Sequence, residues 1–115
     1  MHIWARNTGK RIPVKVPPGR FLLVQAGKQI EHLTGGLIKA GLHEVVVNSS
    51  TLEVIEKRKV ENPDRPLIRI SSTFFWHLNS DFDLEPIPEL KARVERMGEE
   101  VGTYSKMKVG DQVSM

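Results

Sequence analysis

The chain has 115 residues, 39% of them hydrophobic and 27% charged, which is the composition of a soluble globular protein and the length of one small domain. It contains no cysteine, which excludes disulfide bonds and thiolate metal sites within the chain. The formal net charge is +3, but basic and acidic residues are interleaved and no nucleic-acid-binding motif accompanies them, so the pattern does not favour nucleic acid as a partner.

The sequence also lacks the signals that direct a chain to a membrane. The first twenty residues mix Arg6, Lys10, Arg11 and Lys15 with apolar positions and have no continuous apolar run of the kind found in signal peptides. No segment approaches the roughly 20 apolar residues that span a bilayer. We therefore expect a soluble protein of the cytoplasm.

Short strands and turns are predicted for the first part of the chain. Two alternating runs flank the turn sequence NTGK, so residues 1–16 are expected to form a β-hairpin. The run RFLLVQA, residues 20–26, predicts the next strand. The segment GKQIEHLTGG, residues 27–36, predicts an irregular or single-turn segment that two glycines close.

A second strong strand is predicted at LHEVVVN, residues 42–48, where His43 shares one face with Val45 and Val47. A short amphipathic surface helix is predicted next, over residues 52–59.

The following segment, residues 67–76, is apolar and β-branched, which predicts a third strand. Arg69 and Ser71 lie two positions apart and so share one face of it. A guanidinium inside a strand needs a partner, because a buried unpaired charge is costly. The partner could be a glutamate of this chain, such as Glu44 or Glu53, or an anion that binds from solution.

The C-terminal part is predicted to be helical, with one helix over residues 88–100 and the start of another at the end of the chain. Short strands with Gly/Pro turns, a short inserted helix and a C-terminal helix predict a mainly β fold, namely part of a double-stranded β-helix of the jelly-roll or cupin type. We expect one partial domain over residues 1–115, with the barrel portion at 1–87 and a helical tail at 88–115.

Two segments resemble a known family in sequence and in order. LLVQAGKQIEHLTGGLIKAGLHEVVV is similar to the strand–Gly–Asp–x–Leu–Glu–x–x–Thr–Asn–Gly–strand–His element of the isopenicillin-N-synthase-like branch of the Fe(II)- and 2-oxoglutarate-dependent oxygenases. RISSTFFWHLNSD, followed by LEPIPEL, is similar to the Arg-x-Ser-x-x-Phe-Phe strand of that branch and the residues after it. The resemblance covers about residues 17–90, which correspond to the C-terminal half of such an enzyme.

The resemblance implies roles for three residues. His43 would be the second histidine of a two-histidine, one-carboxylate site for Fe(II). Arg69 and Ser71 would bind the distal carboxylate of 2-oxoglutarate, which suits the planar fork of an arginine. The implied cofactor and cosubstrate are Fe(2+) and 2-oxoglutarate, the implied substrate is a small organic molecule, and no further residue of the chain is assigned a catalytic role.

The chain also departs from the family pattern. No His-x-Asp or His-x-Glu pair precedes His43, Lys28 stands where the family has aspartate, and the connection from His43 to Arg69 is longer than the usual turn. We therefore expect the C-terminal portion of a longer dioxygenase, in preference to an autonomous relict. The alternative function is a non-catalytic cupin-like binding or interaction module. In either case, unpaired strand edges are expected to favour self-association.

Overall fold

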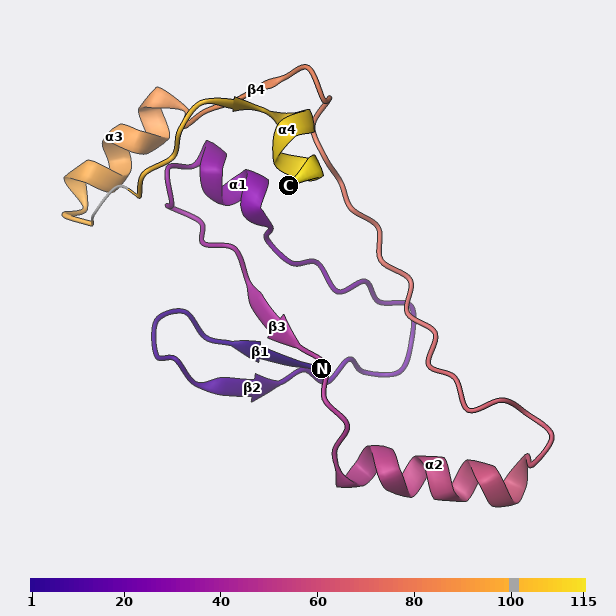
Figure 1. Cartoon of the computed structure of the whole chain (residues 1–115). Coiled ribbons are helices and arrows are strands. Elements are labelled where there is room, and N and C mark those ends of the chain that lie inside the picture. Colours follow the sequence, from indigo (N-terminus) through magenta and orange to yellow (C-terminus); the bar gives the residue numbers. More distant parts are fainter. Residues whose placement is uncertain (100–101) are drawn as a thin grey trace.

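The computed structural model describes residues 1–99 and 102–115, which form short helices and strands joined by long connections (Figure 1). In chain order the elements are β1 (His2–Trp4), β2 (Arg11–Pro13), α1 (Lys28–Leu33), β3 (Leu42–Glu44), α2 (Ser49–Glu61), β4 (Asp83–Leu84), α3 (Pro88–Arg96), β5 (Met107–Lys108) and α4 (Val109–Ser114). Helices contain 30% of the residues and strands about 12%.

The N-terminal strands form a small antiparallel sheet in the order β2-β1-β3. Ile3 of β1 pairs with Ile12 on one side and with His43 on the other. The β1–β2 turn closes with a hydrogen bond from the Gly9 N–H to the Ala5 carbonyl, 2.7 Å long, and Gly9 has a φ of 65°, which a glycine adopts without strain. The predicted hairpin is therefore confirmed.

The small core lies in a second group of elements, which we call the helical cluster: α1, α3, α4 and the antiparallel pair β4–β5. Its fully buried side chains are Leu84 of β4, Val94 of α3 and Val109 of α4. A hydrogen bond of 2.9 Å from the Ile87 N–H to the Leu33 carbonyl joins the end of α1 to the link between β4 and α3. These contacts hold together segments that are distant in the sequence.

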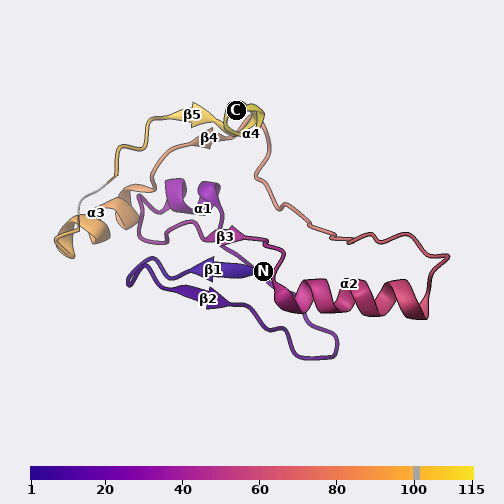
Figure 2. The same cartoon turned by 60° about the horizontal axis from the view of Figure 1, so that its bottom comes forward.

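Helix α2 projects from the rest of the chain, as both views show (Figures 1 and 2). It begins at a capping box, in which the Asn48 side chain accepts a hydrogen bond from the Thr51 N–H at 3.0 Å. No residue of α2 is buried, so capping and ion pairs along its surface support it rather than packing.

The fold is much less compact than a typical domain of this length. Its radius of gyration is 19.2 Å, whereas a compact domain of this length has about 13 Å. Its accessible surface is 9764 Å², against about 6,300 Å² for a folded monomer of the same mass. Many large apolar side chains are exposed, including Leu22, Ile70, Phe74 and Trp76, each more than four-fifths accessible.

The expected mainly β, jelly-roll fold is wrong for this structure. Residues 20–26 and 67–76 run as extended chain but belong to no strand, and the strand predicted at 42–48 is reduced to the three residues of β3. The reason is pairing: a jelly roll needs each strand to bond to neighbours, and the described parts of the chain place no partner strand beside these segments.

The predicted helices are present with different bounds. The one expected at 52–59 is longer, as α2, because the cap lies at Asn48. The one expected at 88–100 ends as α3 at Arg96, and Gly98 follows with a φ of 71°; residue 100 lies outside the described residues. Within those residues, no helix is long and apolar enough to cross a bilayer.

Replacing Leu84 by alanine tests the importance of the small core. Because Leu84 is fully buried, we expect the L84A variant to lose about 2–4 kcal/mol of unfolding free energy, measured by urea titration with circular dichroism. Val60→Ala on α2 is the control, because Val60 is 82% exposed, and it should change the value by less than about 0.5 kcal/mol. Equal losses in the two variants would contradict this assignment of the core.

Candidate functional site

His43 occupies the middle of β3, opposite Ile3 of β1, and its side chain is exposed. The neighbouring Glu44 points to the other face of the sheet, where its carboxylate forms an ion pair with the guanidinium of Arg11. Glu44 is therefore already engaged, and it is not positioned to share a ligand with His43.

A metal centre needs more donors than His43 provides. Across residues 1–99 and 102–115, no group of three His, Cys, Asp or Glu side chains is arranged to hold a metal ion. Fe(II) of the facial-triad type requires two imidazoles and a carboxylate that converge in fixed geometry. The donor set in the described part of this chain does not fit an iron centre by itself.

Arg69 and Ser71 lie on the long extended segment between α2 and β4, and both are exposed. Among the described residues, neither side chain has a hydrogen bond, and Arg69 has no ion-pair partner within 4.0 Å. Glu44, one of the partners expected from the sequence, pairs with Arg11 instead. The guanidinium of Arg69 is thus accessible to an anion from solution.

The structure does not bring the three residues predicted from the sequence together. In both views α2 leads away from β3, and the segment that carries Arg69 and Ser71 runs from the far end of α2 to β4 (Figures 1 and 2). No hydrogen bond or ion pair in the described chain connects either residue to His43. Arg69 and Ser71 therefore form one part of the candidate site on the extended segment, and His43 forms a separate part on the sheet.

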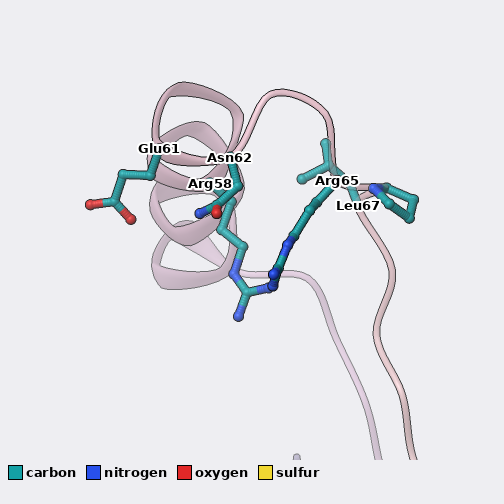
Figure 3. A pocket seen from close by; sticks show the side chains of 6 residues that line it. Arg58, Glu61, Asn62, Arg65 and Leu67 are labelled. Atoms are coloured by element: carbon teal, nitrogen blue, oxygen red, sulfur yellow. The ribbon is translucent and has the colours of Figure 1, made fainter.

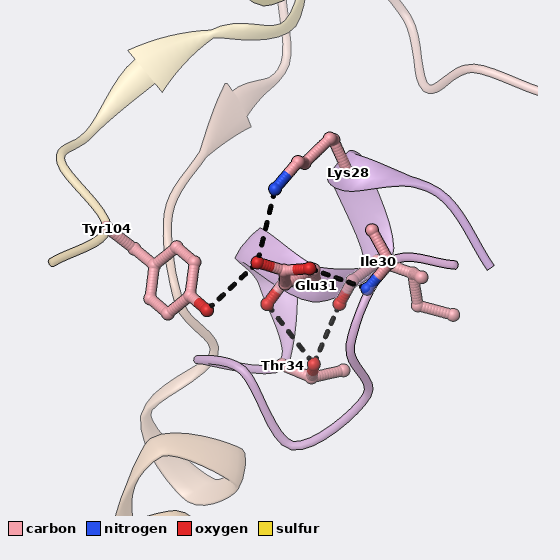
Figure 4. A network of polar contacts seen from close by, with 6 residues as sticks. Lys28, Ile30, Glu31, Thr34 and Tyr104 are labelled. Carbon is pink, nitrogen blue, oxygen red and sulfur yellow. Dashed lines mark hydrogen bonds and ion pairs between the residues drawn. The ribbon is translucent and has the colours of Figure 1, made fainter. Parts of the chain in front are cut away.

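The position of β3 is set by the turn that precedes it, which Thr34 organises (Figure 4). The Thr34 hydroxyl donates to the Ile30 carbonyl at 2.8 Å and accepts a hydrogen bond from the Ile38 N–H at 3.1 Å. Gly35 and Gly36 follow with φ values of 61° and 87°, the left-handed region that favours glycine. The end of α1 therefore closes into a defined turn.

Glu31 fixes the next part of this connection, from within the helical cluster. Its carboxylate is buried and accepts hydrogen bonds from the Ala40 N–H at 2.5 Å and from the Tyr104 hydroxyl at 3.3 Å, while the Lys28 ammonium lies 3.5 Å away (Figure 4). Ala40 is three residues before His43, so this carboxylate anchors the approach to β3.

The same contacts change two pKa values. Burial raises the pKa of Glu31, but the hydrogen bond from Ala40 and the positive charge of Lys28 together outweigh it, and the pKa is lowered overall. Burial and the adjacent Glu31 charge raise the pKa of Tyr104. At neutral pH, Glu31 is therefore an ionised acceptor and Tyr104 a neutral donor.

A cavity of about 250 Å³ opens beside this network and is lined by Lys28, Glu31, His32, Tyr104 and Gln112, among others. The His32 ring contacts the Tyr104 ring with centroids 5.2 Å apart, and its buried Nε2 has no hydrogen-bond partner among the described residues. Because the Glu31 carboxylate already accepts hydrogen bonds from the Ala40 N–H and the Tyr104 hydroxyl, we assign it a structural role in this cavity.

Glu31, Thr34 and Tyr104 are not among the residues that the sequence predicts to be functional. The one local signal was the pair of glycines directly after Thr34, which is typical of a helix end. The contact between Glu31 and Tyr104 joins residues 73 positions apart, so no local pattern predicts it.

Comparisons with models of known protein families, with curated protein sequences and with solved structures found no match for this chain.

Replacing Glu31 by glutamine tests the anchoring role through its pH dependence. Because folding lowers the pKa of Glu31, its charge stabilises the fold above the unfolded-state pKa of about 4.5, and this contribution disappears as the pH falls through the lower folded-state value. We expect E31Q to be less stable than the natural chain at pH 7 by about 1 kcal/mol.

The measurement is a series of urea titrations from pH 7 to pH 3, in which the difference between the two proteins should shrink with falling pH. Glu89→Gln, at an exposed position of α3, is the control. A difference that stays constant over the whole range would contradict the anchoring role.

Proposed function

We propose that this chain is the C-terminal portion of a non-haem Fe(II)- and 2-oxoglutarate-dependent dioxygenase that oxidises a small organic substrate. In this proposal Arg69 and Ser71 bind the distal carboxylate of 2-oxoglutarate, and His43 supplies one iron ligand. The resemblance of residues 17–90 to the isopenicillin-N-synthase-like branch underlies the proposal.

The observation that carries the proposal is the state of Arg69. It is exposed, and no carboxylate in the described chain lies within ion-pair distance of its guanidinium. Ser71 lies two positions further along extended backbone, so both side chains point to the same side. A guanidinium fork with an adjacent hydroxyl is suited to bind one carboxylate through charge-assisted hydrogen bonds.

The chain's own residues account for cosubstrate binding but not for the metal centre. His43 is the one donor that the resemblance assigns, and the described residues do not complete a ligand set around it. We therefore assign to this chain the binding and orientation of 2-oxoglutarate, and we derive no oxidation step from its residues.

A second candidate function is a non-catalytic interaction module, and one observation favours it. In the segment of Arg69, the side chains of Ile70, Phe74, Phe75 and Trp76 are between 71% and 91% exposed. An extended segment with unpaired backbone and accessible apolar side chains can add as a strand to the sheet of another chain. The same segment would then serve association instead of cosubstrate binding.

The proposed cosubstrate site is tested by calorimetric titration of the purified chain with 2-oxoglutarate under anaerobic conditions. We expect saturable binding that Arg69→Ala weakens by at least about tenfold, because a charge-assisted pair of hydrogen bonds contributes about 1.5–3 kcal/mol. Ser71→Ala should weaken binding less. Arg93→Ala, which removes an equal charge from α3, is the matched control and should bind as the natural chain does.

A parallel titration with Fe(II), followed by the visible absorption of the iron chelate, tests the role of His43. Because the described residues do not complete a ligand set around His43, we expect no chelate band from the chain alone. A band that His43→Ala abolishes would show that further ligands complete the site. Equal weakening of 2-oxoglutarate binding by Arg69→Ala and Arg93→Ala would contradict the proposed site.

The interaction module is tested by sedimentation velocity over a range of protein concentrations. Self-association through the apolar segment should decrease in Phe74→Lys and remain in Val60→Lys, which places the same charge on exposed α2. Strictly monomeric behaviour of the natural chain at all concentrations would count against strand-edge association.

A further inference from the structure

Two arginines lie close together at the C-terminal end of α2. Arg58 of the helix and Arg65 of the following turn line a cavity of about 230 Å³, and the other lining residues are Glu61, Asn62, Pro66 and Leu67. Figure 3 shows the two guanidinium groups pointing toward one another, with the Asn62 side chain beside them.

The local sequence brings these side chains together. The helix ends with a hydrogen bond of 2.9 Å from the Asn62 N–H to the Arg58 carbonyl. Pro63 then enters a four-residue turn, which a bond of 3.1 Å from the Arg65 N–H to the Asn62 carbonyl closes. This reversal returns Arg65 to the helix end beside Arg58, so the pairing follows from the backbone.

The carboxylates of α2 do not neutralise the pair. Glu61 lies 3.7 Å from the Lys57 ammonium, and its side chain points away from the guanidinium groups (Figure 3). In the described chain, no carboxylate lies within 4.0 Å of the guanidinium of Arg58 or Arg65. Two like charges that face one another repel, and a bound anion between them adds an attractive interaction with each arginine that offsets this repulsion.

We propose that Arg58, Arg65 and Asn62 form a binding site for a phosphate-type oxyanion, either free or as the phosphoryl group of a small molecule. The three side chains supply planar guanidinium forks and an amide donor, and the two positive charges match a dianion. The apolar side chain of Leu67 lines one side of the cavity. This site is separate from Arg69 and Ser71 and does not depend on the proposed oxygenase function.

The test is a titration of the full chain with inorganic phosphate at low ionic strength, followed by ³¹P NMR and calorimetry. We expect saturable binding of one phosphate per chain. Arg58→Gln and Arg65→Gln should each weaken it at least about tenfold, since each removes one charge-assisted fork. The control Arg93→Gln lowers the net charge equally and should change the affinity less than twofold.

Two further titrations, one with lysine variants and one with a second ligand, test how the site binds the oxyanion. Arg58→Lys and Arg65→Lys retain the charge and lose the fork, so their affinities should fall between those of the natural chain and the glutamine variants. A titration with phenyl phosphate tests the source of the oxyanion. If the chain binds phenyl phosphate more tightly than inorganic phosphate, the ligand is a phosphoryl group on a larger molecule. If it binds phenyl phosphate more weakly, the ligand is free phosphate.

Three results would overturn the proposal: no saturable phosphate binding, unchanged binding in both glutamine variants, or equal weakening by Arg93→Gln. Glutamine and lysine are good helix formers and both positions are exposed, so circular dichroism should show α2 retained in every variant.

Discussion

One buried carboxylate joins the parts of this chain. Glu31 accepts hydrogen bonds from the Ala40 N–H and from Tyr104, and so connects α1 both to the residues that lead into β3 and to the segment before β5. The apolar core is small and lies within the helical cluster. Because few buried apolar side chains are available, the arrangement of the sheet relative to this cluster depends on a polar contact, which has a large effect in a water-poor environment.

That dependence separates the candidate functional residues into two groups. His43 follows the anchored turn, so its position is tied to Glu31 through the backbone of Ala40. Arg69 and Ser71 lie on the long segment between α2 and β4, whose last part is tied to α1 by a hydrogen bond of 3.1 Å from the Leu78 N–H to the Gln29 side chain. A site that combines both groups therefore requires the long segment to gain a partner, either a ligand carboxylate or a strand of another chain.

Local chemistry predicted the elements whose stabilising contacts are also local. The Gly9 turn, the α2 helix after Asn48 and the helix that starts at Pro88 were predicted from neighbouring residues, and each is present. The strands at 20–26 and 67–76 were not found, because β-branched alternation indicates extended backbone without specifying which segment lies beside it. In the same way, the pairing of Arg58 with Arg65 depends on the geometry of a turn that composition alone does not reveal.

The long connection between α2 and β4 has a consequence for how the chain responds to proteases. A protease binds its substrate as exposed, extended backbone, and residues 69–77 are exposed and belong to no helix or strand, so they reach that form with little local unfolding. Cleavage there would leave β1, β2, α1, β3 and α2 on one fragment and β4, α3, β5 and α4 on the other, so it would separate α1 from the rest of the helical cluster. The hydrogen bonds from Ile87 to Leu33 and from Tyr104 to Glu31 cross that division, so these contacts are among those that would hold the two fragments together in the nicked molecule.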